Sequence, residues 1–254
     1  MGDIALIHLA AREIDAGRPV AMATVIATSR SVPRHVGAQM LVRADGSISG
    51  TIGGGEMEAR VVSEAQRAMA DGRPKTVLYS LVDPGQGDPG VCGGDVEVYV
   101  EPYLQPASML IVGGGHVGRA VAELAAWSGF DAIVWDDREE LLADIDARCV
   151  TGDIAAALHG LSLDERSIIV VVTRNTALDI EIMPTLLATP CAYIGVMGSR
   201  RRWATTRDAL VALGHDDDQL SRVHNPIGME IGAETPTEIA ISIIAEVIST
   251  RERS

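Results

Sequence analysis

The sequence predicts an α/β protein with two domains: a smaller α+β domain over residues 1–104 and a Rossmann-like domain with a doubly wound parallel sheet over residues 105–254. The chain of 254 residues is 47% apolar but only 3% aromatic, which suits α/β layers of small, closely packed side chains. After the short linker bracketed by Pro102 and Pro106, strand and helix patterns alternate strictly. This change of pattern predicts the domain boundary.

The first domain begins with apolar residues at helical spacing, which predict a helix over residues 3–16 that ends at Gly17. Asp45-Gly46 between two short apolar runs indicates a hairpin. The glycine run 53–55 precedes a predicted helix at 56–69. Strands are predicted at 20–28, 40–42, 47–51, 76–81 and 95–101.

The second domain shows the alternation of a parallel, doubly wound sheet. Strands are predicted at 108–113, 131–136, 148–151, 167–173 and 190–195. Helices are predicted at 116–128, 138–146, 176–188 and 199–213, with a last helix from Pro236. Thr235-Pro236-Thr237-Glu238 forms a capping box with proline at the first helical position, so this motif has a structural explanation.

A dinucleotide-binding fingerprint opens the second domain. Gly113, Gly115 and Gly118 fit the spacing G-x-G-x-x-G directly after a predicted strand and at the start of an apolar helix. Asp136 follows at the end of the next strand, where an acidic residue binds a ribose hydroxyl in such folds. These residues are candidate cofactor ligands and NAD is a possible cofactor, although Asp136 could instead cap the following helix.

Charge and hydropathy exclude several classes of function. A formal net charge of −14 disfavours binding to nucleic acid and to anionic membranes. The apolar runs fall far short of the roughly 20 residues that cross a bilayer. The acidic N-terminus lacks the features of a secretory signal, and the three widely spaced cysteines fit a reducing compartment, so we expect a cytoplasmic protein.

Three further segments carry candidate binding residues. Gly53, Gly54 and Gly55 offer backbone N–H groups at a helix start that could cradle a phosphate, although the adjacent Glu56 also fits a simple capped turn. Arg200 and Arg201 begin a predicted helix where acidic residues would be favoured. They therefore indicate a phosphate site, or else they are solvated or ion-paired arginines. Glu234 lies between a glycine-rich loop and a helix N-terminus, a place where ligands are often bound.

Cysteine chemistry singles out Cys92, which precedes Gly93-Gly94 in a predicted loop. An accessible thiol there is a candidate reactive thiol and soft metal ligand, with packing at a strand start as the alternative. Cys149 and Cys191 lie in predicted strands and are interpreted as buried apolar residues.

Several motifs together resemble one known family over nearly the whole chain. They are Ser31-Val32-Pro33-Arg34, Ser49 to Ala59 around Gly53-Gly54-Gly55, Cys92 to Val98, Thr173-Arg174 with Asp179, Ala192 to Arg201, and Asn225 to Pro236. In combination they resemble the xanthine dehydrogenase accessory family XdhC/CoxI. The sequence departs from that family at Glu56, where many relatives carry a cysteine. Either Cys92 supplies the thiol, or binding rests on backbone and charge, or this member has diverged.

The resemblance implies a chaperone rather than an enzyme. Such a protein would bind molybdenum cofactor (molybdopterin), support its sulfuration by a cysteine desulfurase or sulfurtransferase, and dock on the apo-enzyme of a molybdenum hydroxylase such as xanthine dehydrogenase. It would use the candidate residues named above, with Cys92 as the metal ligand. A homodimer is expected from the frequency of such assemblies. The alternative is an NAD-dependent oxidoreductase, although no constellation with recognisable catalytic spacing is seen.

Overall fold

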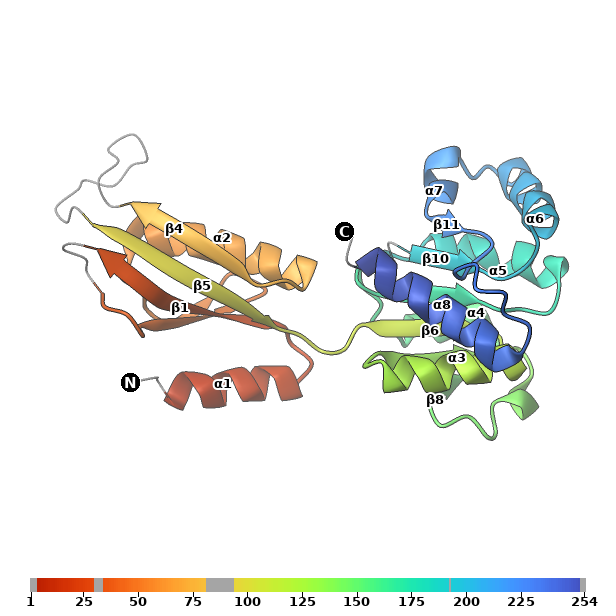
Figure 1. The fold of residues 1–254 in the computed structure, drawn as a ribbon, viewed down its shortest axis with the longest axis horizontal. Coiled ribbons are helices and arrows are strands. Elements are labelled where there is room, and N and C mark those ends of the chain that lie inside the picture. The colour runs from red at the N-terminus through yellow and green to blue at the C-terminus, as the bar shows by residue number, and fades with distance from the viewer. Residues whose placement is uncertain (1–3, 30–33, 81–93, 192, 252–254) are drawn as a thin grey trace. The chain divides into compact units, whose positions relative to one another are not determined.

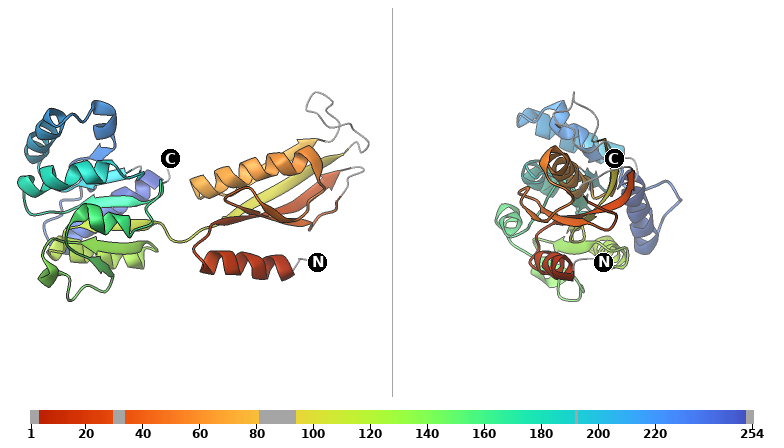
Figure 2. Two further views of the ribbon diagram at one scale, coloured as in Figure 1. Left: turned by 180° about the vertical axis from the view of Figure 1, so that it is seen from behind. Right: turned by 90° about the vertical axis from the view of Figure 1, so that its left-hand side faces the viewer.

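The computed structural model describes residues 4–29, 34–80, 94–191 and 193–251. The chain forms two compact units, Met1–Gln105 and Pro106–Ser254. The first contains an antiparallel sheet with two helices, and the second contains a parallel sheet with helices on both faces (Figures 1 and 2). The predicted fold class, a Rossmann-like parallel sheet preceded by an α+β domain, is confirmed.

The N-terminal unit is built on a five-stranded sheet in the order β3-β2-β1-β5-β4, with antiparallel pairing throughout. Its elements are α1 Ile4–Asp15, β1 Val20–Ser29, β2 Gln39–Arg43, β3 Ile48–Gly50, α2 Gly55–Asp71, β4 Lys75–Ser80 and β5 Asp95–Tyr103. Alternation along β1 sends Ala21 and Ala23 into the core beneath α2, while Val20 and Met22 pack with α1. The two helices therefore cover opposite faces of this sheet.

The C-terminal unit has a six-stranded parallel sheet in the order β11-β10-β9-β6-β7-β8. Its strands are β6 Ser108–Val112, β7 Asp131–Trp135, β8 Arg148–Val150, β9 Ile168–Val171, β10 Tyr193–Val196 and β11 Val223–His224. Its helices are α3 His116–Trp127, η2 Glu139–Leu141, α4 Ile154–His159, α5 Thr176–Leu187, α6 Arg200–Ala212, α7 Asp217–Ser221 and α8 Pro236–Arg251.

Two apolar cores sandwich the parallel sheet. One core joins α3 and α8 to the sheet through residues such as Val121 and Ile243. The other joins the helices α4, α5, α6 and α7 to the opposite face through residues such as Ile182 and Leu210. From β6 the chain moves to β7 on one side and later returns to β9 on the other. In open parallel sheets such a reversal forms a crevice at the carboxyl ends of the two strands where the order reverses, here β6 and β9, and ligands usually bind there.

One predicted helix is wrong. Residues 138–146 contain only the 3₁₀ helix η2, Glu139–Leu141. A longer helix there would carry Asp144 and Asp146 in its last turn, against its dipole, and aspartate is a poor helix former. Two helices were missed: α4, which begins at the capping residue Asp153, and α7, which is closed by a capping box between Asp216 and Gln219.

The capping box predicted for the last helix is confirmed. The backbone N–H of Glu238 donates to Thr235 Oγ1 at 3.3 Å, and the N–H of Thr235 donates to the Glu238 carboxylate at 2.9 Å. A second N–H, that of Glu234, also donates to this carboxylate. These hydrogen bonds lower the pKa of Glu238, because they stabilise the charged form.

Candidate functional site

The turn from β6 into α3 shows which of the fingerprint glycines serve packing. A Cβ on Gly118 would lie 1.7 Å from the Gly113 carbonyl oxygen, and one on Gly113, whose φ is +123°, would lie 2.8 Å from the Val172 carbonyl oxygen. Both therefore allow close backbone packing. Gly115 differs, because a Cβ there would meet no atom within 4 Å. Its backbone is thus open to a ligand.

The first turn of α3 presents free hydrogen-bond donors. The backbone N–H groups of Gly115, His116 and Val117 have no acceptor among the residues that the structure describes. The first amides of a helix have no partner within the helix. Together with the helix dipole, these donors favour an anion such as a phosphate.

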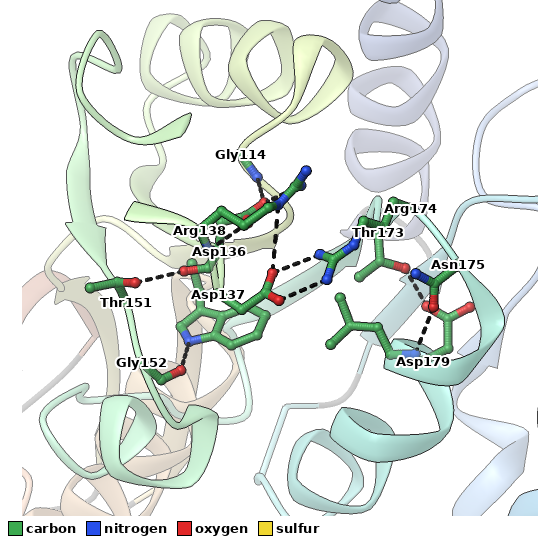
Figure 3. A network of polar contacts seen from close by, with 12 residues as sticks. Gly114, Asp136, Asp137, Arg138, Thr151, Gly152, Thr173, Arg174, Asn175 and Asp179 are labelled. Atoms are coloured by element: carbon green, nitrogen blue, oxygen red, sulfur yellow. Dashed lines mark hydrogen bonds and ion pairs between the residues drawn. The ribbon is translucent and has the colours of Figure 1, made fainter. Parts of the chain in front are cut away.

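Asp136 lies directly after β7, where the fingerprint predicts it, and only 2% of it is exposed. One carboxylate oxygen accepts the Gly114 N–H at 2.8 Å, and the other accepts the backbone N–H and Nε of Arg138, each at 3.0 Å (Figure 3). The N-cap of η2 is Arg138, so Asp136 does not cap that helix. Its carboxylate instead ties the end of β7 to the glycine loop.

An ion pair bridges the crevice. Arg174, which follows β9, donates from Nη1 and Nη2 to the two oxygens of Asp137, which follows β7, at 2.7 and 2.8 Å (Figure 3). Since β6 lies between β7 and β9 in the sheet, the pair spans the carboxyl end of β6. The hydrogen bonds from Arg174 lower the pKa of Asp137 to about 2, so the pair is charged at neutral pH.

A second polar group lies on the neighbouring elements. Asp179 on α5 is fully buried and accepts Nε and Nη2 of Arg202 at 2.9 and 2.6 Å, as well as the Thr173 hydroxyl. Arg202 lies in the first turn of α6, so the group joins β9, α5 and α6. One of the three arginines at the start of α6 is therefore structural, because an unpaired buried carboxylate is costly.

The other two cations of that helix are exposed. Arg200 and Arg201 lie in the first turn of α6, after the N-cap Ser199, whose hydroxyl accepts the Arg202 N–H at 3.2 Å. The α6 N-terminus follows β10, two strand positions from β6, which is roughly 10 Å along the sheet edge. Arg200 and Arg201 thus share the carboxyl edge with Gly113, Gly115, Gly118 and Asp136.

The glycine run of the N-terminal unit has a carboxylate of its own. Glu58 Oε1 accepts the backbone N–H groups of Ile52, Gly53 and Gly54 at 3.0, 3.3 and 2.9 Å, and the Thr51 hydroxyl at 2.6 Å. Burial alone would raise the pKa of Glu58, but these hydrogen bonds outweigh it and lower the pKa below 4.5. The amides predicted to cradle a phosphate thus already bind an anion.

The remaining candidates are distributed over both units. Gly55 and Glu56 begin α2 in the N-terminal unit, and Glu56 is exposed. Glu234 is exposed just before α8. Cys92 lies outside the described residues. Within those residues, no cluster of His, Cys, Asp and Glu could hold a metal ion.

The two described cysteines are free thiols. Cys191 is fully buried, and Cys149 on β8 is half-buried. Burial raises the pKa of both thiols, which makes them poor nucleophiles at neutral pH. No helix among the described residues is long and apolar enough to cross a membrane.

Comparisons with known proteins match both units. The profile of the XdhC Rossmann domain matches residues 109–247, and that of the XdhC and CoxI family matches residues 13–80. The chain belongs to the XdhC/CoxI family. A solved structure described as a xanthine dehydrogenase from Bacillus halodurans covers 100% of this chain, and this chain covers 97% of it. Its TM-score is 0.51 at 23% identity, a likeness of fold.

Three curated proteins are similar in sequence to this XdhC/CoxI member. YqeB of Escherichia coli is 36% identical over 93% of this chain, which spans only 44% of YqeB. PaoD of Escherichia coli, named a molybdenum cofactor insertion chaperone, is 22% identical over 97% of this chain and 88% of PaoD. A probable xanthine dehydrogenase subunit of Bacillus subtilis is 34% identical over 59% of this chain and 45% of that protein.

Sequence reasoning did not assign a role to the ion pair of Asp137 and Arg174. A signal was available, because Asp137 lies two positions after the end of β7 and Arg174 lies three positions after the end of β9. The carboxyl ends of parallel strands meet at one edge. What the sequence could not show was that β7 and β9 flank β6, which is a property of the sheet order.

Proposed function

We propose that this chain is an accessory protein that binds molybdenum cofactor and delivers it to the apo-enzyme of a xanthine dehydrogenase-type hydroxylase. The observation that carries the proposal is its relationship to PaoD, a molybdenum cofactor insertion chaperone, over 97% of the chain. Profile matches to both units add support. In this proposal a cysteine desulfurase or sulfurtransferase sulfurates the cofactor while the chain shields it, and the chain itself turns over no substrate.

The crevice of the C-terminal unit fits the phosphate of such a cofactor. The open backbone at Gly115 and the unpartnered amides of His116 and Val117 would hold the phosphate oxygens. Arg200 and Arg201 would add positive charge at the same sheet edge. These donors fit an anionic group, whereas the described residues offer no ligand set for the metal. The bound cofactor would bring the redox metal that the acceptor enzyme uses.

The thiol role is proposed for Cys92, because the resemblance to the XdhC/CoxI family implies a cysteine at the position that Glu56 occupies in this sequence. A thiolate is a soft ligand that suits molybdenum or a transferable sulfur. The two described cysteines are poor alternatives, because burial raises their pKa and keeps them protonated.

The experiment is purification from a molybdenum-replete host, followed by metal analysis and fluorescence of the oxidised pterin. We expect molybdenum and pterin close to stoichiometric with wild-type chain, and less of both in Cys92→Ala and Arg200→Ala. Matched controls are Cys149→Ala, which removes a half-buried thiol, and Arg67→Ala, which removes an exposed cation on α2. Both controls should retain the cofactor.

The second candidate is an NAD-dependent oxidoreductase, favoured by the fingerprint glycines and by Asp136 at the end of β7. A ribose hydroxyl would have to displace Gly114 or Arg138 from the Asp136 carboxylate, because both oxygens are already bonded. A wild-type chain that carries no molybdenum or pterin but binds NAD tightly would overturn the chaperone in favour of this candidate.

A further inference from the structure

One face of the N-terminal sheet is covered over only part of its width. α1 packs on this face through Leu6 and Ala10, which join Met22 of β1 and Leu41 of β2 in one apolar cluster (Figure 1). Glu101 of β5 lies directly opposite Met22, and residues directly opposite each other point to the same face. The face therefore continues from β1 onto β5 and the edge strand β4.

The half of this face formed by β4 and β5 combines apolar and acidic side chains. Alternation along β5 places Tyr99 and Glu97 on the same face as Glu101, and Leu78 of β4 lies opposite Glu97. Leu78 is 64% exposed and Glu101 is also exposed, while Tyr99 is half-buried. A cover for this half-sheet has to offer both apolar groups and a cation.

α1 carries a second apolar stripe, on the side that faces away from its own sheet. Ile4, Ile7 and Ala11 are three or four positions apart, so they lie along one side of the helix. Ile4 is 62% exposed and Ile7 is 55% exposed, whereas Leu6 and Ala10 on the other side are buried against β1 and β2. Since one apolar side suffices to anchor a surface helix, the outer stripe is free to pack on a second surface.

The charge of this outer side is complementary to that of the half-sheet. α1 carries no acidic residue before Glu13, and Arg12 is exposed. Arg12 Nε donates to the His8 carbonyl oxygen at 3.3 Å, and the Glu101 carboxylate accepts the Tyr103 hydroxyl at 2.7 Å. Neither Arg12 nor Glu101 forms an ion pair with a residue that the structure describes. An α1 helix from another copy therefore supplies the apolar groups and the cation that the half-sheet lacks.

We propose that two copies of this chain associate through these surfaces, with the outer stripe of each α1 packed on β4 and β5 of the other copy. Each copy offers both surfaces, so one two-fold rotation satisfies both contacts and closes the assembly. The two α1 helices then form a single layer between the two sheets. The inference goes beyond the proposed function, because the association requires no cofactor.

The two-fold axis also fixes the register of the contact. It lies between the two α1 helices and parallel to them, and a rotation has no translation along its axis. The partner's α1 therefore lies at the same height on β5 as α1 does on β1. Glu13 is bonded to Arg43, which lies opposite Val20 at the start of β1. Arg12 of each copy thus lies beside Glu101 of the other, which pairs two positions further along β1.

The same register places Ile7 and Ile4 of each copy over Tyr99 and Leu78 of the other, because a helix rises about 1.5 Å and a strand about 3.3 Å per residue. With its 12 residues, α1 is about 18 Å long and about 10 Å wide. Each copy contributes one helix and one half-sheet, or roughly 360 Å² of projected area before side-chain relief is counted. This is the small end of specific interfaces, so we expect a dissociation constant in the micromolar range.

Sedimentation equilibrium of the full chain over micromolar concentrations tests the association, and we expect a reversible dimer. Ile7→Glu places a carboxylate against the acidic half-sheet and should weaken the dimer at least about tenfold. Trp127→Glu is the matched control, because Trp127 is 86% exposed on α3 of the other unit and receives the same charge. It should leave the dimer unchanged. A monomeric wild type, or a dimer that Trp127→Glu breaks and Ile7→Glu does not, would overturn the proposal.

Reversal of the charges tests the register. Arg12→Glu and Glu101→Arg each bring like charges together and should weaken the dimer about tenfold, because the contact occurs twice. Both changes in one chain restore opposite charges across the axis and should return the dissociation constant to within about threefold of wild type. Circular dichroism establishes that each variant is folded. If the double variant dimerises no more tightly than the single variants, the proposed surface is refuted.

Discussion

Two glycine runs in this protein look alike in sequence but have different chemistry in the structure. In the N-terminal unit the amides of Gly53 and Gly54 bind Glu58 of the same chain. In the C-terminal unit Asp136 takes the amide of Gly114, and the next amides stay free at the α3 N-terminus. At the strand-to-helix junction before α2 the backbone amides are hydrogen-bonded within the chain, whereas at the junction before α3 they are open to a ligand.

The difference teaches that a glycine run before a helix does not by itself indicate an anion site. Consecutive amides need an acceptor, and the decisive question is whether the fold provides one. Glu58 provides it from the first turn of α2. No described carboxylate reaches Gly115.

The largest expected effect comes from closing the space at the C-terminal junction. Gly118→Ala would place a Cβ 1.7 Å from the Gly113 carbonyl oxygen, so the backbone must shift and the unit should lose about 3 kcal/mol of stability or more. Gly115→Ala is the control, since its Cβ meets nothing within 4 Å and should cost less than about 1 kcal/mol. Denaturant unfolding followed by circular dichroism measures both. Equal losses would contradict the packing argument.

A smaller effect is expected from removing the internal anion. Glu58→Gln replaces charge-assisted hydrogen bonds to three amides and Thr51 by weaker ones, and should cost about 2 kcal/mol. Glu56→Gln changes an exposed neighbour and should be nearly neutral. Urea unfolding of the wild type and both variants separates these outcomes.

The same side chain predicts a pH dependence. Because the pKa of Glu58 is lowered from 4.5 on folding, its stabilisation is complete above pH 4.5 and is lost as the pH falls through the lowered pKa. Glu58→Gln should therefore lose less stability on acidification than wild type does. If wild type and variant respond alike between pH 5 and pH 3, the contribution of the Glu58 charge is refuted.

The smallest effect is expected from added phosphate. Hydrogen exchange should be slow at Ile52 and Gly54, whose amides are bonded, and faster at His116 and Val117, whose amides are free. Millimolar phosphate should slow exchange at the second pair only, since weak binding to the native state protects the groups it contacts. Protection of both pairs, or of neither, would contradict the conclusion that only the amides before α3 are free to bind an anion.

Much of the architecture could be predicted from sequence, because the spacing of apolar residues and the residues at helix ends indicate where strands and helices form. The apolar run of β6 followed by Gly113 predicted strand, turn and helix, and Thr235 with Glu238 predicted the start of α8. The helix at 138–146 was wrongly predicted from the alternation of strands and helices, since only η2 forms there. The short helices α4 and α7 were missed, although their caps, Asp153 and Asp216, were visible in the sequence.

The candidate site was predictable only in part. The sequence placed Gly113, Gly115, Gly118 and Asp136 at one strand-to-helix turn because they are close along the chain, and the structure adds Arg200 and Arg201 at the same edge. It also indicated an anion at the start of α6, either a phosphate held by Arg200 and Arg201 or the carboxylate of an ion pair. That the partner of Arg202 is the buried Asp179, and not a ligand, required the packing of α5 on α6.

The sequence by itself determined the fold class, the family and the position of the fingerprint, because these depend on local periodicity and on motifs of adjacent residues. Only the tertiary structure decided which donors are free. Glu58 lies a full turn beyond the amides that it binds, and Asp137 and Arg174 meet across β6 although 37 positions separate them. The availability of a polar group depends on what folding brings within hydrogen-bond distance, and no local pattern encodes that distance.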